Sequence, residues 1–385
     1  QLLISIIELT MTNIREDFTP TDLRYTLFAG RKNFENYQHL RDVFAANDIL
    51  RPIPLSYSFE YNQHMEYQAK TLLELIRLQK EKKINLLFST KYLSDFSAYT
   101  TPLETHFGIF RNLVLYFASD PKLAHELTNN MDIFGGVLLN EMDFASNSVN
   151  DNIKTTAEFD AKTQEFVIYS AKGSAKFCQY FNSFGSHVII MCKLVNGGEA
   201  LGNYPILVKL RDGKTGEVQR GIEIKWLGPS LGHRGGREYC VSFDNLRVPL
   251  KNHLLNKHLT IEEKGVSLAQ PEMLLDFLTK VALMQQRLLE SYRAARELSK
   301  AVYLVTKYTK MRTQFKTMPT KGQERKIFDY QYNKMRIAKS LTNAIVFQTA
   351  LSLFNDKVAM MSMDLKKNGQ SLNEYMIFTD AIHAL

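Results

Sequence analysis

The stretch TTAEFDAKTQEFVIYS, residues 155–170, carries the clearest local signal of fold in this sequence. Two short runs rich in Thr, Phe, Val, Ile and Tyr flank the polar segment AKTQ, which is the pattern of a β-hairpin. Further strand-like runs follow at 187–194, 205–211 and 238–243, separated by turns that contain glycine. Several strands at short spacing, with no helical run among them, predict a small β-sandwich or barrel.

Glycine divides the rest of the chain around this segment. Of the 19 glycines, 15 lie between residues 135 and 265. Because glycine is common in turns and weakens helices, the middle is predicted to be β-rich and the flanks helical. The sequence therefore predicts an α+β multidomain protein. We expect an N-terminal helical domain at 1–134, a β-barrel-like domain at 135–264 and a helical bundle at 265–385.

The C-terminal part has the longest helical pattern. Between Pro271 and Phe315 there is no further proline and no glycine, and apolar residues recur at helical spacing. This predicts one very long helix or two nearly continuous ones. The segment TMPTKGQ breaks the pattern, and a second long helix is expected over about 325–367, with a third toward the end of the chain. Shorter amphipathic helices are expected at 66–86 and 103–130.

Composition narrows the class of protein. The chain is 45% hydrophobic and 23% charged, as expected for a folded protein, and no apolar run reaches the roughly 18 residues of a membrane span. The formal net charge is +8, but Lys and Arg are spread along the predicted helices beside Asp and Glu, so nucleic-acid binding is not predicted. A basic cleft for an anionic ligand, such as a nucleotide or coenzyme A, stays open.

Several common motifs are missing from the sequence. It has no GxGxxG, no GxxxxGK[ST] and no GxSxG, so Rossmann, P-loop and α/β-hydrolase chemistry have no support. The three cysteines lie far apart without a CxxC pair, and the nine histidines are scattered. His253 and His258 are poorly spaced to bind one metal from a single helix face, so no metal site is predicted.

Four segments together resemble a known family. The hairpin at 155–170, LRDGKTGEVQRGI at 210–222, and GPSLGHRGG with SFDNLRVP at 228–249 occur in the order found in the acyl-CoA oxidase branch of the acyl-CoA dehydrogenase superfamily. YTKMRTQF at 308–315 followed by FDYQ at 328–331 is similar to that family's R-x-Q-F…D-x-Q arrangement. Three of these segments lie in the predicted β-barrel-like domain and one in the predicted helical bundle, and HFGIF at 106–110 is a weaker match in the N-terminal domain.

This resemblance implies both a fold and an activity. It implies a helical domain, a β-barrel-like domain and a four-helix bundle, with FAD bound in the cleft between them. Members oxidise a fatty acyl-CoA to the trans-2-enoyl-CoA in β-oxidation, commonly as dimers. The peroxisome is the implied location, with the mitochondrion as the alternative for dehydrogenase relatives.

The resemblance also implies cofactor-binding residues. Arg312 matches the arginine that contacts the FAD diphosphate, a role that suits a planar guanidinium because it can bond two phosphate oxygens. Gln314 and Phe315 match the residues beside it. On the β-domain side, Asn140 stands where the family has a threonine near flavin N5. Phe177 keeps an aromatic position of the second flavin segment, and Tyr180 in the same segment is the third candidate cofactor contact on this side.

Other positions depart from the family pattern. Asp143 and Ala145 replace two glycines, Cys178 replaces a tryptophan, and Tyr180 falls near the glycines of the second flavin segment. Extra side chains in a packed site are unfavourable. The flavin motifs are therefore degenerate, and whether the chain is an enzyme stays open.

Two functions follow as hypotheses. One is an acyl-CoA oxidase-like flavoprotein that binds FAD and fatty acyl-CoA. The other is an inactive family member that serves as a structural or assembly subunit, as a homodimer or in a larger complex. The family's catalytic carboxylate is expected beyond Leu385, after a CGGxGY-like turn, so no catalytic residue is assigned in this chain.

Overall fold

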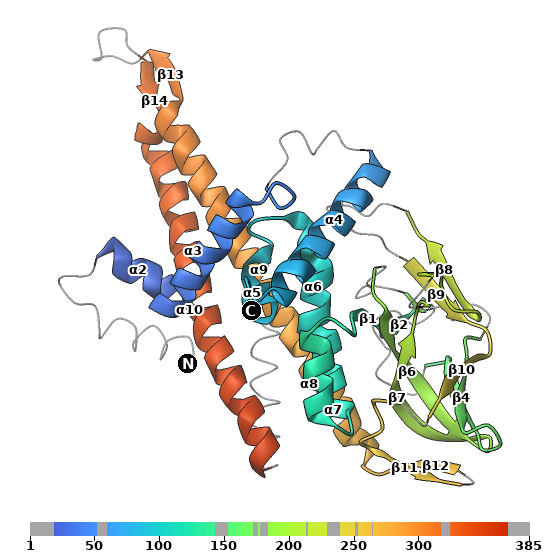
Figure 1. Cartoon of the computed structure of the whole chain (residues 1–385). Coiled ribbons are helices and arrows are strands. Elements are labelled where there is room, and N and C mark those ends of the chain that lie inside the picture. Colours follow the sequence, from blue (N-terminus) through green and yellow to red (C-terminus); the bar gives the residue numbers. More distant parts are fainter. Residues whose placement is uncertain are drawn as a thin grey trace. The chain divides into compact units, whose positions relative to one another are not determined.

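The computed structural model describes ten ranges of the chain: 19–51, 60–142, 153–171, 176–177, 184–212, 215–228, 239–250, 253–263, 265–316 and 324–368 (Figure 1). The chain divides into two compact units. We call Ala45–Arg287 the central unit, and Gln1–Phe44 together with Leu288–Leu385 the terminal unit. Helices and sheets occur together, so the predicted α+β multidomain class is confirmed. The three predicted domain boundaries stay a prediction.

The central unit opens with helices. They are α4 (Tyr61–Lys80), α5 (Leu86–Leu93), η2 (Ala98–Thr100), α6 (Thr101–Thr105), the π-helical turn η3 (His106–Phe110), α7 (Arg111–Phe117) and α8 (Pro121–Asn129). The helix expected at 103–130 is therefore divided into several pieces. One break has a clear cause, because Pro121 occupies the start of α8 and Asp120 caps it, with its Oδ1 accepting from the backbone N–H groups of Lys122 and Leu123.

The strands of the central unit form a large sheet, a smaller one and a two-stranded ribbon. They are β1 (Gly135–Leu138), β2 (Asn140–Glu141), β3 (Thr156–Asp160), β4 (Glu165–Tyr169), β5 (Lys176–Phe177), β6 (His187–Asn196), β7 (Glu199–Lys209), β8 (Ile222–Trp226), β9 (Tyr239–Phe243), β10 (Leu246–Pro249), β11 (Leu259–Glu262) and β12 (Gly265–Leu268). The six-stranded sheet has the order β1-β6-β3-β4-β10, with β7 paired to β6; the four-stranded sheet has the order β2-β5-β9-β8; and β11 pairs with β12.

The predicted hairpin at 155–170 is confirmed. Strands β3 and β4 pair antiparallel, with Phe159 opposite Phe166, and both rings are buried. The strand pattern alternates because one face of the hairpin packs on the core. The runs predicted at 187–194, 205–211 and 238–243 also form strands, as β6, β7 and β9.

Strand β6 lies at the centre of the main core. It pairs with β1 and β3 in parallel and with β7 antiparallel, and its residues 188–192 are buried. The same core includes apolar residues of α7, such as Leu113 and Phe117. A strand that is covered on both faces carries a continuous apolar run, which explains the sequence VIIMC here.

Long helices dominate the terminal unit. α9 (Glu272–Met311) begins in the central unit and continues into the terminal unit, and it confirms the predicted very long helix. α10 (Gln331–Asn368) confirms the second one, but it begins after the predicted start because residues 324–326 pair as a strand. That strand, β14 (Glu324–Lys326), pairs with β13 (Thr313–Lys316), and η4 (Ile327–Asp329) leads into α10. The third predicted helix lies outside the described residues.

Two further helices complete the described N-terminal part: α2 (Pro20–Leu27) and α3 (Arg31–Ala46). Arg296 of α9 stacks over the rings of Phe28 and Tyr37, at 4.8 and 4.9 Å from their centroids. Cation–π contacts of this kind therefore join the N-terminal helices to α9 within the terminal unit.

One segment passes the length and composition test for a membrane span. Among the described residues, Gln331–Phe354 of α10 has a mean hydropathy of 1.2 over its best window, of which 22% is buried. Core helices of soluble proteins pass the same test. A single such helix is therefore weak evidence for a membrane span.

Candidate cofactor site

The β side of the predicted cofactor site lies in the four-stranded sheet. Strands β2 and β5 pair antiparallel, and this places Asn140 directly opposite Phe177. Asn140 is half-buried, so part of its side chain is accessible for a ligand. Tyr180, like Asp143, Ala145 and Cys178, lies outside the described residues. The structure therefore brings two of the three predicted β-side residues together.

The residue next to Asn140 has a structural role that the sequence alone did not predict. Glu141 is almost fully buried, with 1% of its surface exposed. Its carboxylate accepts hydrogen bonds from the backbone N–H of Lys154, from the backbone N–H of Thr155 at 2.7 Å and from the Thr155 hydroxyl at 2.7 Å. A buried carboxylate must be bonded in this way to be tolerated. Glu141 thus ties the end of β2 to the residues that precede β3.

The bundle side of the predicted site lies in the terminal unit. Arg312 follows α9, while Gln314 and Phe315 lie on β13. The Arg312 carbonyl accepts from the Ile327 N–H at 3.0 Å, and the Gln314 carbonyl accepts from the Tyr330 hydroxyl at 3.2 Å. These bonds fix the backbone of the R-x-Q-F segment.

Phe315 occupies an unusual position on this ribbon. Its φ is +61°, in the left-handed region, where the pairing of β13 with β14 shifts register between Gln314 and Lys316. A bulge of this kind redirects a side chain out of the regular alternation. The phenyl ring is 68% exposed, so it is displayed on the surface of the terminal unit.

The side chains present are chemically suited to a flavin dinucleotide. Arg312 is exposed, and within the described ranges its guanidinium has neither an ion-pair nor a hydrogen-bond partner. Such a group can bind a diphosphate through two parallel hydrogen bonds. The Asn140 amide can both donate and accept, which suits the polar edge of a flavin ring. Arg312 belongs to the terminal unit and Asn140 to the central unit.

Of the buried histidines, His106, His253 and His258 bond to the backbone, whereas His64 bonds to the Tyr99 hydroxyl. His253 accepts from the Leu207 N–H at 3.0 Å through Nε2, and His258 bonds through Nε2 to the Tyr116 carbonyl at 3.2 Å. His106 donates from Nε2 to the Thr128 carbonyl at 3.0 Å and accepts at Nδ1 from the Gly135 N–H. In the part of the chain that the structure describes, no group of three His, Cys, Asp or Glu side chains is arranged to hold a metal ion.

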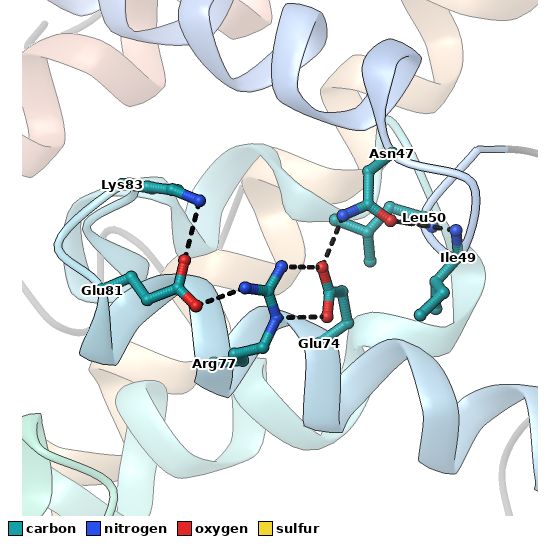
Figure 2. Close-up of polar contacts among 7 residues, drawn as sticks. All are labelled: Asn47, Ile49, Leu50, Glu74, Arg77, Glu81 and Lys83. Carbon is teal, nitrogen blue, oxygen red and sulfur yellow. Dashed lines mark hydrogen bonds and ion pairs between the residues drawn. The ribbon is translucent and has the colours of Figure 1, made fainter.

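Charged side chains on and beside α4 form a hydrogen-bonded cluster with a structural role. Figure 2 shows Arg77 between two carboxylates, with Nη2 at 2.6 Å from Glu74 Oε1 and Nη1 bonded to Glu81. The Glu74 Oε1 also accepts from the Asn47 amide, and Asn47 Oδ1 accepts from the backbone N–H groups of residues 49 and 50. The cluster therefore fastens the turn after α3 to α4, with every carboxylate engaged by neighbours.

Comparisons with known proteins agree with this architecture. The sequence model of the acyl-CoA oxidase C-alpha1 domain matches residues 281–385. Residues 281–385 thus match a domain of the acyl-CoA oxidases, and most of the chain is similar in sequence to proteins of that family.

Individual relatives are named acyl-CoA oxidases. The chain is 26% identical over 346 residues to acyl-coenzyme A oxidase 1 of Drosophila melanogaster, covering 86% of this chain and 50% of the relative. It is 26% identical over 379 residues to acyl-coenzyme A oxidase 2 of Yarrowia lipolytica, covering 94% and 52%. Peroxisomal acyl-coenzyme A oxidase 1 of Bos taurus is 25% identical over 74% of this chain and 44% of its own length. The chain thus spans about half the length of these relatives.

Solved structures share the fold at lower identity. Acyl-CoA oxidase 1 from Yarrowia lipolytica superposes with a TM-score of 0.81 at 19% identity, covering 98% of this chain and 56% of that one. Acyl-CoA oxidase-1 of Caenorhabditis elegans, solved in complex with FAD and ATP, has a TM-score of 0.75 at 22% identity, covering 92% and 55%. At this identity the likeness establishes the fold alone.

Proposed function

We propose that this chain is part of an acyl-CoA oxidase-like flavoprotein that oxidises fatty acyl-CoA to trans-2-enoyl-CoA in β-oxidation. The observation that carries the proposal is Arg312, an exposed guanidinium that follows α9 in the R-x-Q-F segment and has no partner among the described residues. The names of the relatives support the same activity. The alternative of an inactive structural subunit is not favoured by these relatives.

We assign candidate FAD contacts within each unit by itself. Arg312 would bond the diphosphate through its planar fork, with Gln314 and Phe315 beside it. Asn140 would hydrogen-bond the polar edge of the flavin ring, next to Phe177, and Tyr180 stays a predicted contact outside the described residues. Bound FAD supplies the two-electron acceptor for the oxidation. No catalytic residue of this chain is assigned.

The proposed setting follows from the same relatives. We propose the peroxisome as the location, because a relative in Bos taurus is named as peroxisomal. The mitochondrial alternative has no support from the names of these relatives. We also propose a homodimer, or a place in a larger assembly, as the oligomeric state.

Flavin binding tests the cofactor assignment. Purified protein incubated with FAD and passed through gel filtration should retain the visible flavin absorbance. Arg312→Ala should weaken FAD binding by about tenfold or more, because a charge-assisted contact to the diphosphate is lost. Lys316→Ala is the matched control, since Lys316 is an exposed cation on the same ribbon that is given no flavin contact. Absence of bound flavin, or equal losses in the two variants, would refute the assignment.

Activity needs a separate readout. The complete gene product should lose flavin absorbance when a fatty acyl-CoA is added without oxygen, and recover it when oxygen is admitted. Protein that binds FAD but does not respond to acyl-CoA would support the structural subunit instead. These two results separate cofactor binding from catalysis.

A further inference from the structure

Strand β8 forms one edge of the four-stranded sheet in the central unit (Figure 1). Its inner edge pairs antiparallel with β9, with Ile222 opposite Phe243 and Trp226 opposite Tyr239. Among the strands that the structure describes, none pairs with its outer edge. An edge strand of this kind is a template on which a further strand can pair.

The outer edge of β8 presents backbone groups for such a pairing. The Gly221 carbonyl accepts from the Asp244 N–H at 2.9 Å, so the backbone groups of Gly221 point toward β9. In an antiparallel ladder this direction alternates from one residue to the next, and the N–H and C=O of Ile222 and Ile224 therefore point away from β9. The Ile222 N–H accordingly donates to the Gln219 carbonyl. The Ile224 N–H and C=O are directed at the position of a further strand.

The side chains of β8 differ in chemistry between the two faces of the sheet. Ile222 and Ile224 are half-buried against the core of the central unit. Trp226 alternates onto the same core face, and 47% of its surface is exposed. Glu223 and Lys225 are exposed on the solvent face, where Lys225 Nζ lies 3.1 Å from Glu223 Oε1. The strand thus carries one carboxylate and one ammonium on its solvent face.

This strand is complementary to itself. When a second copy of β8 runs antiparallel with the two Ile224 residues opposite each other, Glu223 of each copy lies opposite Lys225 of the other. In the same register, Ile222 of each copy lies opposite Trp226 of the other. Pairs of opposite charge, and pairs of an aromatic with a β-branched residue, stabilise antiparallel sheets.

The charges also exclude the neighbouring registers. Moving the second copy to the next register that keeps the two faces aligned places Glu223 opposite Glu223, or Lys225 opposite Lys225, depending on the direction of the shift. Like charges directly opposite each other are unfavourable. Charge complementarity therefore selects the register centred on Ile224.

We propose that the outer edge of β8 binds the same edge of a second copy of this chain. The two-fold pairing joins the two sheets through reciprocal hydrogen bonds between the N–H and C=O of the Ile224 residues. It also pairs Glu223 of each copy with Lys225 of the other and covers part of the Trp226 ring. The contact uses none of the residues assigned to FAD, so it does not depend on the proposed oxidation.

Trp226 provides a direct readout, because it is the only tryptophan of the chain. The emission of a tryptophan moves to shorter wavelength when its ring leaves water. In a dilution series of the full chain, the emission should therefore move to longer wavelength as the second copy dissociates. Light scattering on the same samples should show the accompanying fall in mass.

Complementary charge variants test the register. Glu223→Lys places lysines opposite each other and Lys225→Glu places glutamates opposite each other, so each variant alone should associate about tenfold or more weakly than wild type. An equimolar mixture of these two variants restores opposite charges and should associate as wild type does. Glu158→Lys on the exposed face of β3, and Lys162→Glu in the turn after it, are the matched controls. They should behave like wild type, alone and mixed.

Three results would overturn the proposal. One is the same Trp226 emission at every concentration for wild type and both β8 variants, even if light scattering shows a dimer, because that dimer would use another surface. Another is a mixture that associates no better than either variant alone. The third is an equal loss of association in the controls. If a single variant fails to fold, Glu223→Lys combined with Lys225→Glu in one chain still decides, because it keeps opposite charges across the edge and should associate as wild type does.

Discussion

His106 illustrates how a single buried side chain is constrained by its surroundings. Its Nε2 donates to the Thr128 carbonyl and its Nδ1 accepts from the Gly135 N–H, so the ring must be neutral. Burial lowers the pKa of His106 from 6.5 to about 4, and burial also lowers the pKa of His187 and His253 to about 4. The His106 ring therefore accepts the hydrogen bond from Gly135 of β1 only while it is unprotonated.

This predicts a loss of stability in acid. Between pH 6.5 and 4 the unfolded chain binds a proton at His106 and the folded chain does not, so the free energy of unfolding falls as the pH decreases through this window. His106→Gln should reduce the loss between pH 7 and pH 5 by about 2 kcal/mol, measured by urea unfolding. The exposed His125→Gln is the control and should leave the loss unchanged. Equal losses for wild type and His106→Gln would contradict the prediction.

At the scale of the element, charged side chains on helix α4 hold the neighbouring turn at Asn47 in place. Glu74 is 8% exposed and accepts from both Arg77 and Asn47. The hydrogen bond from Arg77 is the largest cause that lowers the pKa of Glu74. By contrast, the pair of Glu66 and Lys70 on the same helix is well exposed.

Glu74→Ala should therefore destabilise the central unit much more than Glu66→Ala. Removing Glu74 leaves the Asn47 amide without this acceptor and removes the two Arg77 hydrogen bonds to Glu74, although Arg77 keeps its bond to Glu81. The loss should cost about 1–3 kcal/mol. Removing the exposed Glu66 should cost at most about 0.5 kcal/mol. Chemical unfolding of the two variants provides the measurement. Similar costs for both would show that the network does not hold the turn at Asn47.

For the molecule as a whole, local stability should follow burial and pairing. Strand β6 pairs with three strands and is buried, whereas β13–β14 is a two-stranded ribbon whose residues are half-buried or exposed. An isolated two-stranded ribbon is marginally stable, and buried core strands open only on extensive unfolding.

Amide hydrogen exchange should resolve this difference. The amides of Val188–Leu194 that donate within the sheet should be among the slowest in the central unit, because exchange there requires extensive unfolding. Those of Thr313–Lys316 should exchange much faster through local opening. Bound FAD should slow exchange at the amides of Thr313–Lys316 if Arg312 binds its diphosphate. Equal protection of both strands in the unliganded protein would contradict this view of local stability.

Much of the fold follows from local pattern. The hairpin at 155–170 is predictable because its apolar residues alternate around a polar turn, and α9 because no proline or glycine interrupts its pattern. The break before α8 also has a sequence signal in Asp120 and Pro121, which cap and start the helix. The prediction of one helix over 103–130 did not take this signal into account. The overlap of β14 with the start predicted for α10 had no such signal, because residues 324–326 form a strand only by pairing with β13.

The candidate site depends on contacts between distant residues. Order along the chain was enough for Arg312, Gln314 and Phe315 to be recognised as a family segment. The pairing of Asn140 with Phe177, and the burial of Glu141 against Thr155, required the folded chain. Which strands pair and which buried groups form hydrogen bonds depends on packing between residues far apart in the sequence. The periodicity of residues along the chain does not specify these contacts.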